Sequence, residues 1–221
     1  MHKFGGSSLA DAGCFRRVAA IVLDLPDDRV GVVVSAMGGM TDALINLAVL
    51  AERDDDGFNA ELDAIGERYA ATARELLQGD SLVAVLDAWS DDAADIRDVL
   101  KAVALVKSAP QRSRDVVAGY GEIWSARLLA AYLGQEAPAR GGTWVDARRV
   151  LTVRETELGP AVLWDASQAK FDEAVSADFE GIAVMTGFIA TDEAGLQTTL
   201  GRNGSDYSAA IFASLADAAE L

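Results

Sequence analysis

The sequence contains very little histidine and cysteine, and this scarcity excludes several kinds of chemistry. His2 is the only histidine among the 221 residues, so histidine-based metal sites and Ser-His-Asp or Cys-His catalysis are nearly excluded. Cys14 is the only cysteine, so no disulfide can form within the chain, which fits a reducing compartment such as the cytoplasm. We expect Cys14 to be a small buried residue on a helix.

Long apolar runs and an excess of positive charge are also absent. No stretch of about 18 or more apolar residues is uninterrupted, so we expect no membrane span, and the first residues lack the layout of a signal peptide. The net charge of −16 argues against nucleic acid or an anionic membrane as a partner. With 51% hydrophobic residues, the chain is expected to form one sizeable globular domain.

Common nucleotide-binding patterns are missing as well. The chain contains neither the Walker pattern GxxxxGK[ST] nor GxGxxG, so neither a P-loop NTPase nor a dinucleotide-binding Rossmann site is supported. The protein-kinase signature set is absent too. A phosphate site in this chain would have to be built differently.

Strand-like and helix-like segments alternate along the chain. Residues 29–37 (RVGVVVSAM) and 180–190 (EGIAVMTGFIA) are apolar runs typical of strands buried on both faces of a parallel sheet. Residues 58–107 predict at least two helices, broken near residues 78–80, that cover the sheet. The pattern predicts an α/β fold, a three-layer α/β/α sandwich with a mostly parallel sheet.

Helix ends can be placed from capping residues. The apolar spacing predicts a helix over about residues 11–25. The next helix is expected to begin with Thr41 as its N-cap, and a long one to end at Gly134. Near the end of the chain we expect a hairpin tip at residues 193–195, followed by a glycine-rich loop and a final helix.

Three glycine-rich turns follow strand-like runs: KFGGSS, SAMGGMTD and LGRNGSDYS. In an open α/β sheet, ligands bind at the carboxyl ends of strands, where such turns gather. Glycine lets backbone N–H groups approach an anion, and a following helix adds its positive end. Lys3 beside Gly5 and Gly6 would suit a phosphoryl group in transfer. From the residues alone, Lys3 is equally well explained as a solvated lysine.

The order of four motifs carries a resemblance to a known family. KFGGSS, VVVSAMGGMTDAL, GYGEIWSARLL and LGRNGSDYSAA follow one another as they do in the aspartate kinases. The chain most resembles the kinase portion of bifunctional aspartate kinase–homoserine dehydrogenases, because Asn203 lies between Arg202 and Gly204. The resemblance covers essentially the whole chain and implies the amino-acid kinase fold, with an eight-stranded, mostly parallel sheet between helical layers.

The resemblance also implies a reaction and its cofactors. The γ-phosphoryl of ATP would be transferred to the side-chain carboxylate of L-aspartate, giving 4-phospho-L-aspartate. In the family this is the first step of lysine, threonine and methionine biosynthesis. Mg²⁺ would be held mainly through phosphates and water rather than by dedicated protein ligands.

Residues at the phosphate end of the site follow from the resemblance. Lys3 would stabilise the transferring phosphoryl group, and Gly5 and Gly6 would donate backbone N–H groups to it. Ser7 would contact the nucleotide phosphates. Asp206 would orient groups near Mg²⁺ and the phosphates.

Residues at the amino-acid end follow in the same way. Ser35 and Thr41 would lie in the loops that hold the substrate, and Glu122 would accept from its ammonium group. Arg202 would bind a substrate carboxylate, a task that suits its planar fork of donors. Ser205 would belong to the loop that also carries the catalytic aspartate.

Without the resemblance, these charged residues have plainer explanations. Glu122 is also explained as a glutamate in the first turn of a helix, favoured by the helix dipole. Asp206 is also explained as an N-cap or first-turn acid, and Arg202 as a surface arginine.

The sequence departs from the family pattern at both ends. Only Met1 and His2 precede Lys3, and Leu221 comes before the segment that holds the adenine nucleotide in the family. We therefore expect residues 1–221 to be the N-terminal, amino-acid-binding part of an amino-acid kinase domain. The nucleotide-binding remainder and the regulatory domains would be absent.

Two alternatives stay open. The chain could be a non-catalytic aspartate-binding fragment without an ATP site, or a sister amino-acid kinase that uses glutamate or acetylglutamate. The resemblance leaves a homo-oligomer of the full-length protein open.

Overall fold

A four-stranded parallel sheet lies at the centre of the computed structural model, which describes residues 1–53 and 56–221. The strands lie in the order β1 (His2–Phe4), β2 (Arg29–Val34), β6 (Gly181–Thr186) and β3 (Thr143–Val145). All three neighbouring pairs are parallel. The two apolar runs of the sequence thus contain buried strands of a parallel sheet, as predicted. In the structure these strands, β2 and β6, are adjacent and central.

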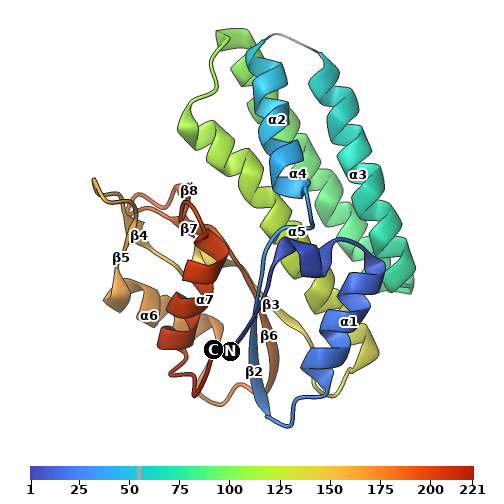
Figure 1. Ribbon diagram of the computed structural model, residues 1–221, viewed down its shortest axis with the longest axis vertical. Helices are drawn as coiled ribbons and strands as arrows, with labels where there is room; N and C mark the ends of the chain where they lie inside the picture. Colours follow the sequence, from blue (N-terminus) through green and yellow to red (C-terminus); the bar gives the residue numbers. More distant parts are fainter. Residues whose placement is uncertain (54–55) are drawn as a thin grey trace.

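Helices cover both faces of this sheet (Figure 1). Helices α6 and α7 lie on one side, and α1 and α5 lie on the other. The helices are α1 (Ala12–Leu23), α2 (Met40–Glu52), α3 (Gly57–Leu76), α4 (Gly79–Val106), α5 (Gln111–Glu136), α6 (Trp164–Ala174) and α7 (Gly204–Leu215), with two short 3-10 turns, η1 (Gly6–Leu9) and η2 (Ala147–Arg149). The predicted three-layer α/β fold class is confirmed. In the described residues, no helix combines the length and apolar character needed to cross a bilayer.

The remaining strands pair outside the central sheet. Two antiparallel pairs form, β4 (Val153–Arg154) with β5 (Ala161–Val162) and β7 (Ile189–Thr191) with β8 (Gln197–Thr199). The expected hairpin tip is found, because Gly195 with φ +76° lies between β7 and β8. The described residues therefore contain eight strands, but only four join the main sheet, where the resemblance implied eight.

Several helix ends match the sequence expectations and two do not. The long helix α5 does not end at Gly134 but continues to Glu136, with Ala137 as its C-cap. Asp11 caps α1 by accepting from the Cys14 backbone N–H at 2.8 Å, and Cys14 is buried as expected. The expected break near residues 78–80 separates α3 from α4. Thr41 is not an N-cap: the φ of +75° at Gly39 turns the chain directly into α2, so Thr41 is the second helical residue.

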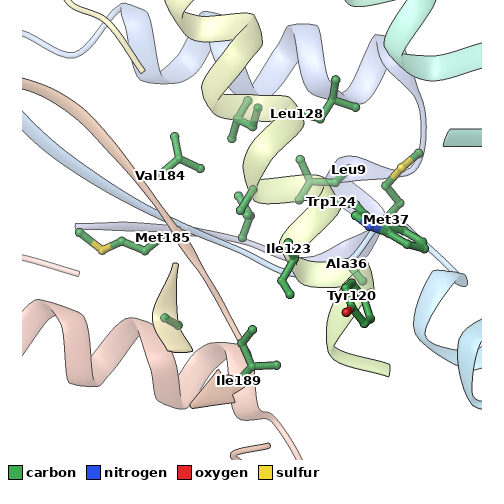
Figure 2. Packing of buried hydrophobic residues seen from close by; sticks show 14 of the residues in the cluster. Leu9, Ala36, Met37, Tyr120, Ile123, Trp124, Leu128, Val184, Met185 and Ile189 are labelled. Carbon is green, nitrogen blue, oxygen red and sulfur yellow. The ribbon is translucent and has the colours of Figure 1, made fainter. Parts of the chain in front are cut away.

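Helix α5 connects the helices α2–α4 to the sheet (Figure 1). Its Trp124 is fully buried, and ring centroids of Tyr69, Trp89 and Tyr120 lie 5.8, 6.1 and 6.0 Å away. Figure 2 shows side chains of α5, Trp124 among them, beside Met37 from the segment that follows β2. Burial of such large apolar surfaces is the main source of stability at this junction.

A charged contact reinforces the same junction. Asp92 of α4 accepts from Trp124 Nε1 at 3.0 Å and from Arg127 Nη1 at 2.8 Å. The Asp92 and Arg127 side chains are only 15% and 16% exposed. The Arg127 guanidinium lies 4.7 Å from the centre of the Trp144 ring on β3, a cation–π contact. One carboxylate therefore joins α4 to α5 and, through Arg127, to the sheet.

We predict that Asp92→Ala lowers the free energy of unfolding by about 2 kcal/mol, because it leaves the Arg127 charge and the Trp124 N–H without their shared acceptor. Asp91→Ala is the matched control, since Asp91 is the exposed neighbour on the same helix. Urea unfolding followed by tryptophan fluorescence measures both variants. Equal midpoints for Asp91→Ala and Asp92→Ala would contradict the structural role of this contact.

Candidate functional site

A cavity of about 610 Å³ lies where segments following β1, β2, β6 and β8 meet. All three glycine-rich turns contribute to its wall, as the sequence predicted. The lining residues are Gly6, Ser7, Ser35, Ala36, Met37, Gly38, Gly39, Thr41, Asp42, Glu122, Phe188, Gly201, Arg202, Asn203, Gly204 and Ser205. The cavity thus occupies the carboxyl-end edge of an α/β sheet, the usual position of a ligand site.

Most of the sequence-predicted site residues line this cavity directly. These are Gly6, Ser7, Ser35, Thr41, Glu122, Arg202 and Ser205. Lys3, Gly5 and Asp206 are outside the lining but belong to the same turns. Lys3 Nζ forms an ion pair with Asp206 at 2.7 Å, which joins the first turn to the first turn of α7.

The first two turns touch each other through their backbones. A Cβ at Gly6 would come within 2.9 Å of the Ala36 carbonyl oxygen, so a side chain at position 6 would force the turns apart. Arg68 of α3, which does not line the cavity, joins the second turn to the segment before α1. Its Nη2 donates to the carbonyl oxygens of Gly38 at 2.6 Å and Ala10 at 3.2 Å. Arg68 belongs to none of the motifs, so sequence reasoning had no signal for this role.

The second and third turns are joined by serine hydroxyls. Ser35 Oγ donates to Ser205 Oγ at 2.7 Å, so two predicted substrate-binding residues contact each other. Phe188 also lines the cavity between β6 and β7, with φ +68°, and its N–H donates to Ser208 Oγ at 2.8 Å. The sequence analysis missed Phe188, although Gly187 directly after the buried strand β6 was a usable signal.

Glu122 lies in the middle of α5, so the explanation of a first-turn glutamate is wrong. The helix begins at Gln111 and runs through the glycines of the AGYG stretch. These glycines allow close packing, since a Cβ at Gly121 would lie 2.9 Å from the Ala36 Cβ. Glu122 is only 4% exposed, and its Oε2 has no hydrogen-bond partner among the described residues. Burial raises the pKa of Glu122 to about 8, opposed in part by the Ala36 backbone N–H.

Arg202 is a basic residue in the lining of the same cavity. It is exposed, and it has no ion pair with any carboxylate in the described part of the chain. Gly201 with φ +73° and Asn203 with φ +58° shape the turn that carries it into α7. Together with the positive N-terminal end of α7, Arg202 makes this wall suitable for an anion. A buried carboxyl group that can ionise toward a cation and an exposed guanidinium together suit a zwitterion with an extra acidic group.

Comparison with known proteins places the chain in a family. The model of the amino acid kinase family matches residues 1–221. The chain belongs to the amino acid kinase family. The resemblance inferred from the motifs is thereby confirmed.

Relatives in this amino acid kinase family carry aspartokinase names. The chain is 36% identical over 218 residues to the chloroplastic bifunctional aspartokinase/homoserine dehydrogenase 1 of Arabidopsis thaliana, covering 97% of this chain and 24% of that protein. It is 38% identical over 220 residues to bifunctional aspartokinase/homoserine dehydrogenase 2 of Escherichia coli K12, covering 98% and 26%. The chain therefore spans about a quarter of the length of these relatives.

Solved structures of the same family agree with the fold. Aspartokinase III of E. coli in complex with aspartate and ADP (R-state) superposes with a TM-score of 0.84 at 27% identity, covering 99% of this chain and 47% of that one. The complex of the same enzyme with lysine and aspartate (T-state) gives the same TM-score and coverage.

We predict that Glu122→Gln changes how stability depends on pH. Between the ordinary pKa of a glutamate and about 8, the folded wild-type protein holds a proton that the unfolded chain releases, so its free energy of unfolding falls as pH rises. The slope contributed by Glu122 is about 1.4 kcal/mol per pH unit at most. Glutamine does not titrate, so the variant should gain stability relative to the wild type across this window and keep a constant advantage above it.

Urea unfolding at a series of pH values measures the difference between the two proteins. Glu173→Gln, an exposed position on α6, controls for loss of a surface carboxylate. A difference between wild type and Glu122→Gln that stays constant over the whole range would contradict the pKa shift.

Proposed function

We propose that this chain is the amino-acid-binding part of an aspartate kinase, and that the cavity binds L-aspartate for phosphorylation of its side-chain carboxylate by ATP. The observation that carries the proposal is that one cavity, among the described residues, holds a buried Glu122 oxygen without a hydrogen-bond partner and the exposed guanidinium of Arg202. A zwitterion with an additional carboxylate satisfies both. The aspartate bound in the structurally similar aspartokinase III of E. coli supports the same ligand.

The amino-acid end of the site would work by complementary charge. Glu122 would accept from the substrate ammonium group, which supplies the partner that Oε2 lacks among the described residues. Arg202 would bind a carboxylate in a bidentate manner. Thr41 and Ser205 would donate to the remaining oxygens, while Ser35, which donates to Ser205 Oγ, would orient the Ser205 hydroxyl toward the substrate.

The phosphate end would work by positioning and charge neutralisation. Lys3, held by Asp206 at 2.7 Å, would pass from that partner to the transferring phosphoryl group. The backbone amides of Gly5 and Gly6 and the hydroxyl of Ser7 would contact the phosphates. The substrate carboxylate is itself an adequate nucleophile, so the transfer would be direct and in line, without a strong base or a covalent enzyme intermediate.

Mg²⁺ would be held through the nucleotide. Among residues 1–53 and 56–221, no three His, Cys, Asp or Glu side chains gather in a way that could hold a metal ion. A donor set of phosphate oxygens and water fits a cation that keeps much of its hydration shell. When bound, Mg²⁺ supplies charge neutralisation on the phosphates.

The compartment and the pathway are also part of this proposal. The single buried cysteine favours a reducing compartment, for which the cytoplasm is our expectation, whereas the matched plant relatives are named chloroplastic. The product, 4-phospho-L-aspartate, would enter lysine, threonine and methionine biosynthesis.

We predict that the whole kinase to which this chain would belong releases ADP from Mg-ATP in the presence of L-aspartate, and that Lys3→Ala in that protein lowers the rate about a hundredfold or more. A coupled ADP assay measures the rate. Lys101→Ala is the control, because Lys101 is 66% exposed on α4 and pairs with its neighbour Asp98, away from the cavity lining.

Three outcomes would contradict the assignment. Near-normal turnover of Lys3→Ala would refute the role given to that lysine. L-aspartate binding without ADP release would favour a non-catalytic binding fragment. A preference for L-glutamate over L-aspartate would favour a sister kinase of the same family.

We predict that L-aspartate binding releases close to one proton per site at about pH 7, and much less above about pH 9. The reason is that free Glu122, with a pKa of about 8, is mostly protonated near neutrality, whereas an ammonium ligand favours its ionised form. Titration calorimetry in buffers of different ionisation enthalpy measures the proton count. Glu122→Gln should show no such release, and equal release by both proteins would assign the proton to another group.

A further inference from the structure

The Ser35–Ala36 segment after β2 is held by four other elements. The Ser35 N–H donates to the Phe4 carbonyl of β1 at 3.1 Å, and Ser35 Oγ donates to Ser205 Oγ of α7 at 2.7 Å. The Ala36 carbonyl oxygen lies against Gly6, where a Cβ would approach to 2.9 Å. The fourth element is α5, and it contacts this segment through a residue that no motif assigned.

That residue is Ser125, one helical turn after Glu122. Its hydroxyl is fully buried and lies 2.6 Å from the Ser35 carbonyl oxygen. The same hydroxyl lies 3.0 Å from the Gly121 carbonyl oxygen and 3.4 Å from that of Glu122. A hydroxyl has one proton to donate and these three partners only accept, so the short contact to Ser35 takes the proton.

The contact connects both ends of one peptide unit to α5. The carbonyl group of the Ser35–Ala36 peptide accepts from Ser125, and its N–H group acts on the Glu122 carboxylate. In a trans peptide these two groups point in opposite directions within one plane. Ser125 and Glu122, three residues apart on the same helix face, can therefore hold the two edges of this plane.

We propose that Ser125 is a positioning residue, which fixes the Ser35–Ala36 peptide so that the Ala36 N–H faces Glu122 and the Ser35 hydroxyl faces Ser205. Ser125 does not line the cavity and would not touch a substrate. The inference deepens the proposed function and rests on it for the identity of the ligand. The positioning of the peptide against Glu122 concerns the ligand-free protein, so it can be tested without knowing the ligand.

The pKa of Glu122 depends on the orientation of the Ser35–Ala36 peptide, because the Ala36 N–H is one of the groups that lower it. Burial raises the pKa of Glu122, and the opposing contributions come from the backbone N–H groups of Ala36 and of Glu122 itself. The charged side chains that line the same cavity are Asp42 of α2 and Arg202 before α7, while Lys3 is engaged by Asp206. Loss of the Ser125 hydroxyl would let the peptide rotate and would weaken the Ala36 contribution, so the pKa of Glu122 would rise further.

The first experiment tests the geometry in the ligand-free protein. The Glu122 carboxyl carbon is titrated by NMR in wild type, Ser125→Ala and Ser167→Ala. Ser167 is the matched control, because it is also a fully buried helical serine that bonds to a backbone, here Thr152, outside the cavity lining. We expect a higher pKa of Glu122 in Ser125→Ala and a wild-type value in Ser167→Ala.

The second experiment connects the geometry to the ligand. Calorimetry of L-aspartate binding from about pH 6 to about 10 should show affinity roughly three- to tenfold weaker in Ser125→Ala, with its pH midpoint displaced upward. Ser167→Ala should bind like the wild type. A merely structural role for Ser125 would lower stability and leave both the pH midpoint and the Glu122 titration unchanged.

The outcomes separate this inference from the proposed function. An unchanged Glu122 titration in folded Ser125→Ala overturns the positioning role, whatever the protein binds. A shifted titration without any L-aspartate binding by the wild type supports the positioning role and refutes the ligand. If Ser125→Ala does not fold, Ser125→Cys replaces it, since a thiol fills nearly the same space but donates weakly; the same criteria then apply.

Discussion

The structure depends on a short segment at the carboxyl end of β2, where the chain leaves the sheet. Ser35 forms hydrogen bonds to β1 and to the helices that carry Ser125 and Ser205, and Ala36 packs closely against Gly6. Because β2 is central in the sheet and paired on both sides, this end is fixed before any side chain of the cavity is considered. The turns that border the cavity are therefore held together by short polar contacts between elements far apart in sequence.

The cavity also resolves an apparent conflict in charge. A chain with net charge −16 is an unfavourable partner for a phosphorylated anionic ligand. Locally the balance differs: Glu122 is driven toward its neutral form by burial, whereas Arg202, the N-terminal end of α7 and Lys3 face the same group of turns. The overall charge thus disfavours polyanionic partners, whereas the charged groups and the helix end around the cavity determine the local potential there.

Much of this arrangement could be predicted from the sequence, because the carboxyl ends of parallel strands must meet at one edge. Glycine turns after the strand-like runs marked the cavity, and Lys3 and Asp206 proved to be close. Local sequence patterns did not predict the features that depend on tertiary packing. Gly119 and Gly121 look like loop residues, but in the structure they let α5 approach Ile189 and Ala36, which places Glu122 in mid-helix. Arg68 and Ser125 act through backbone carbonyls of distant segments, and no local pattern encodes such contacts.

Helix α5 has a mechanical consequence because it runs through two environments. Its 26 residues make a rod about 39 Å long, one part packed among α2–α4 and the other against β3 and β6. Trp89 and Asp92 both contact Trp124, which lies two residues from Glu122 on this helix. Repacking around Trp89 or Asp92 is therefore expected to affect the position of the Glu122 carboxylate, although neither residue lines the cavity. Helices α3 and α4, which carry none of the recognised motifs, thus contact the helix that carries Glu122. Substitutions in them are expected to act on the cavity without changing any residue that lines it.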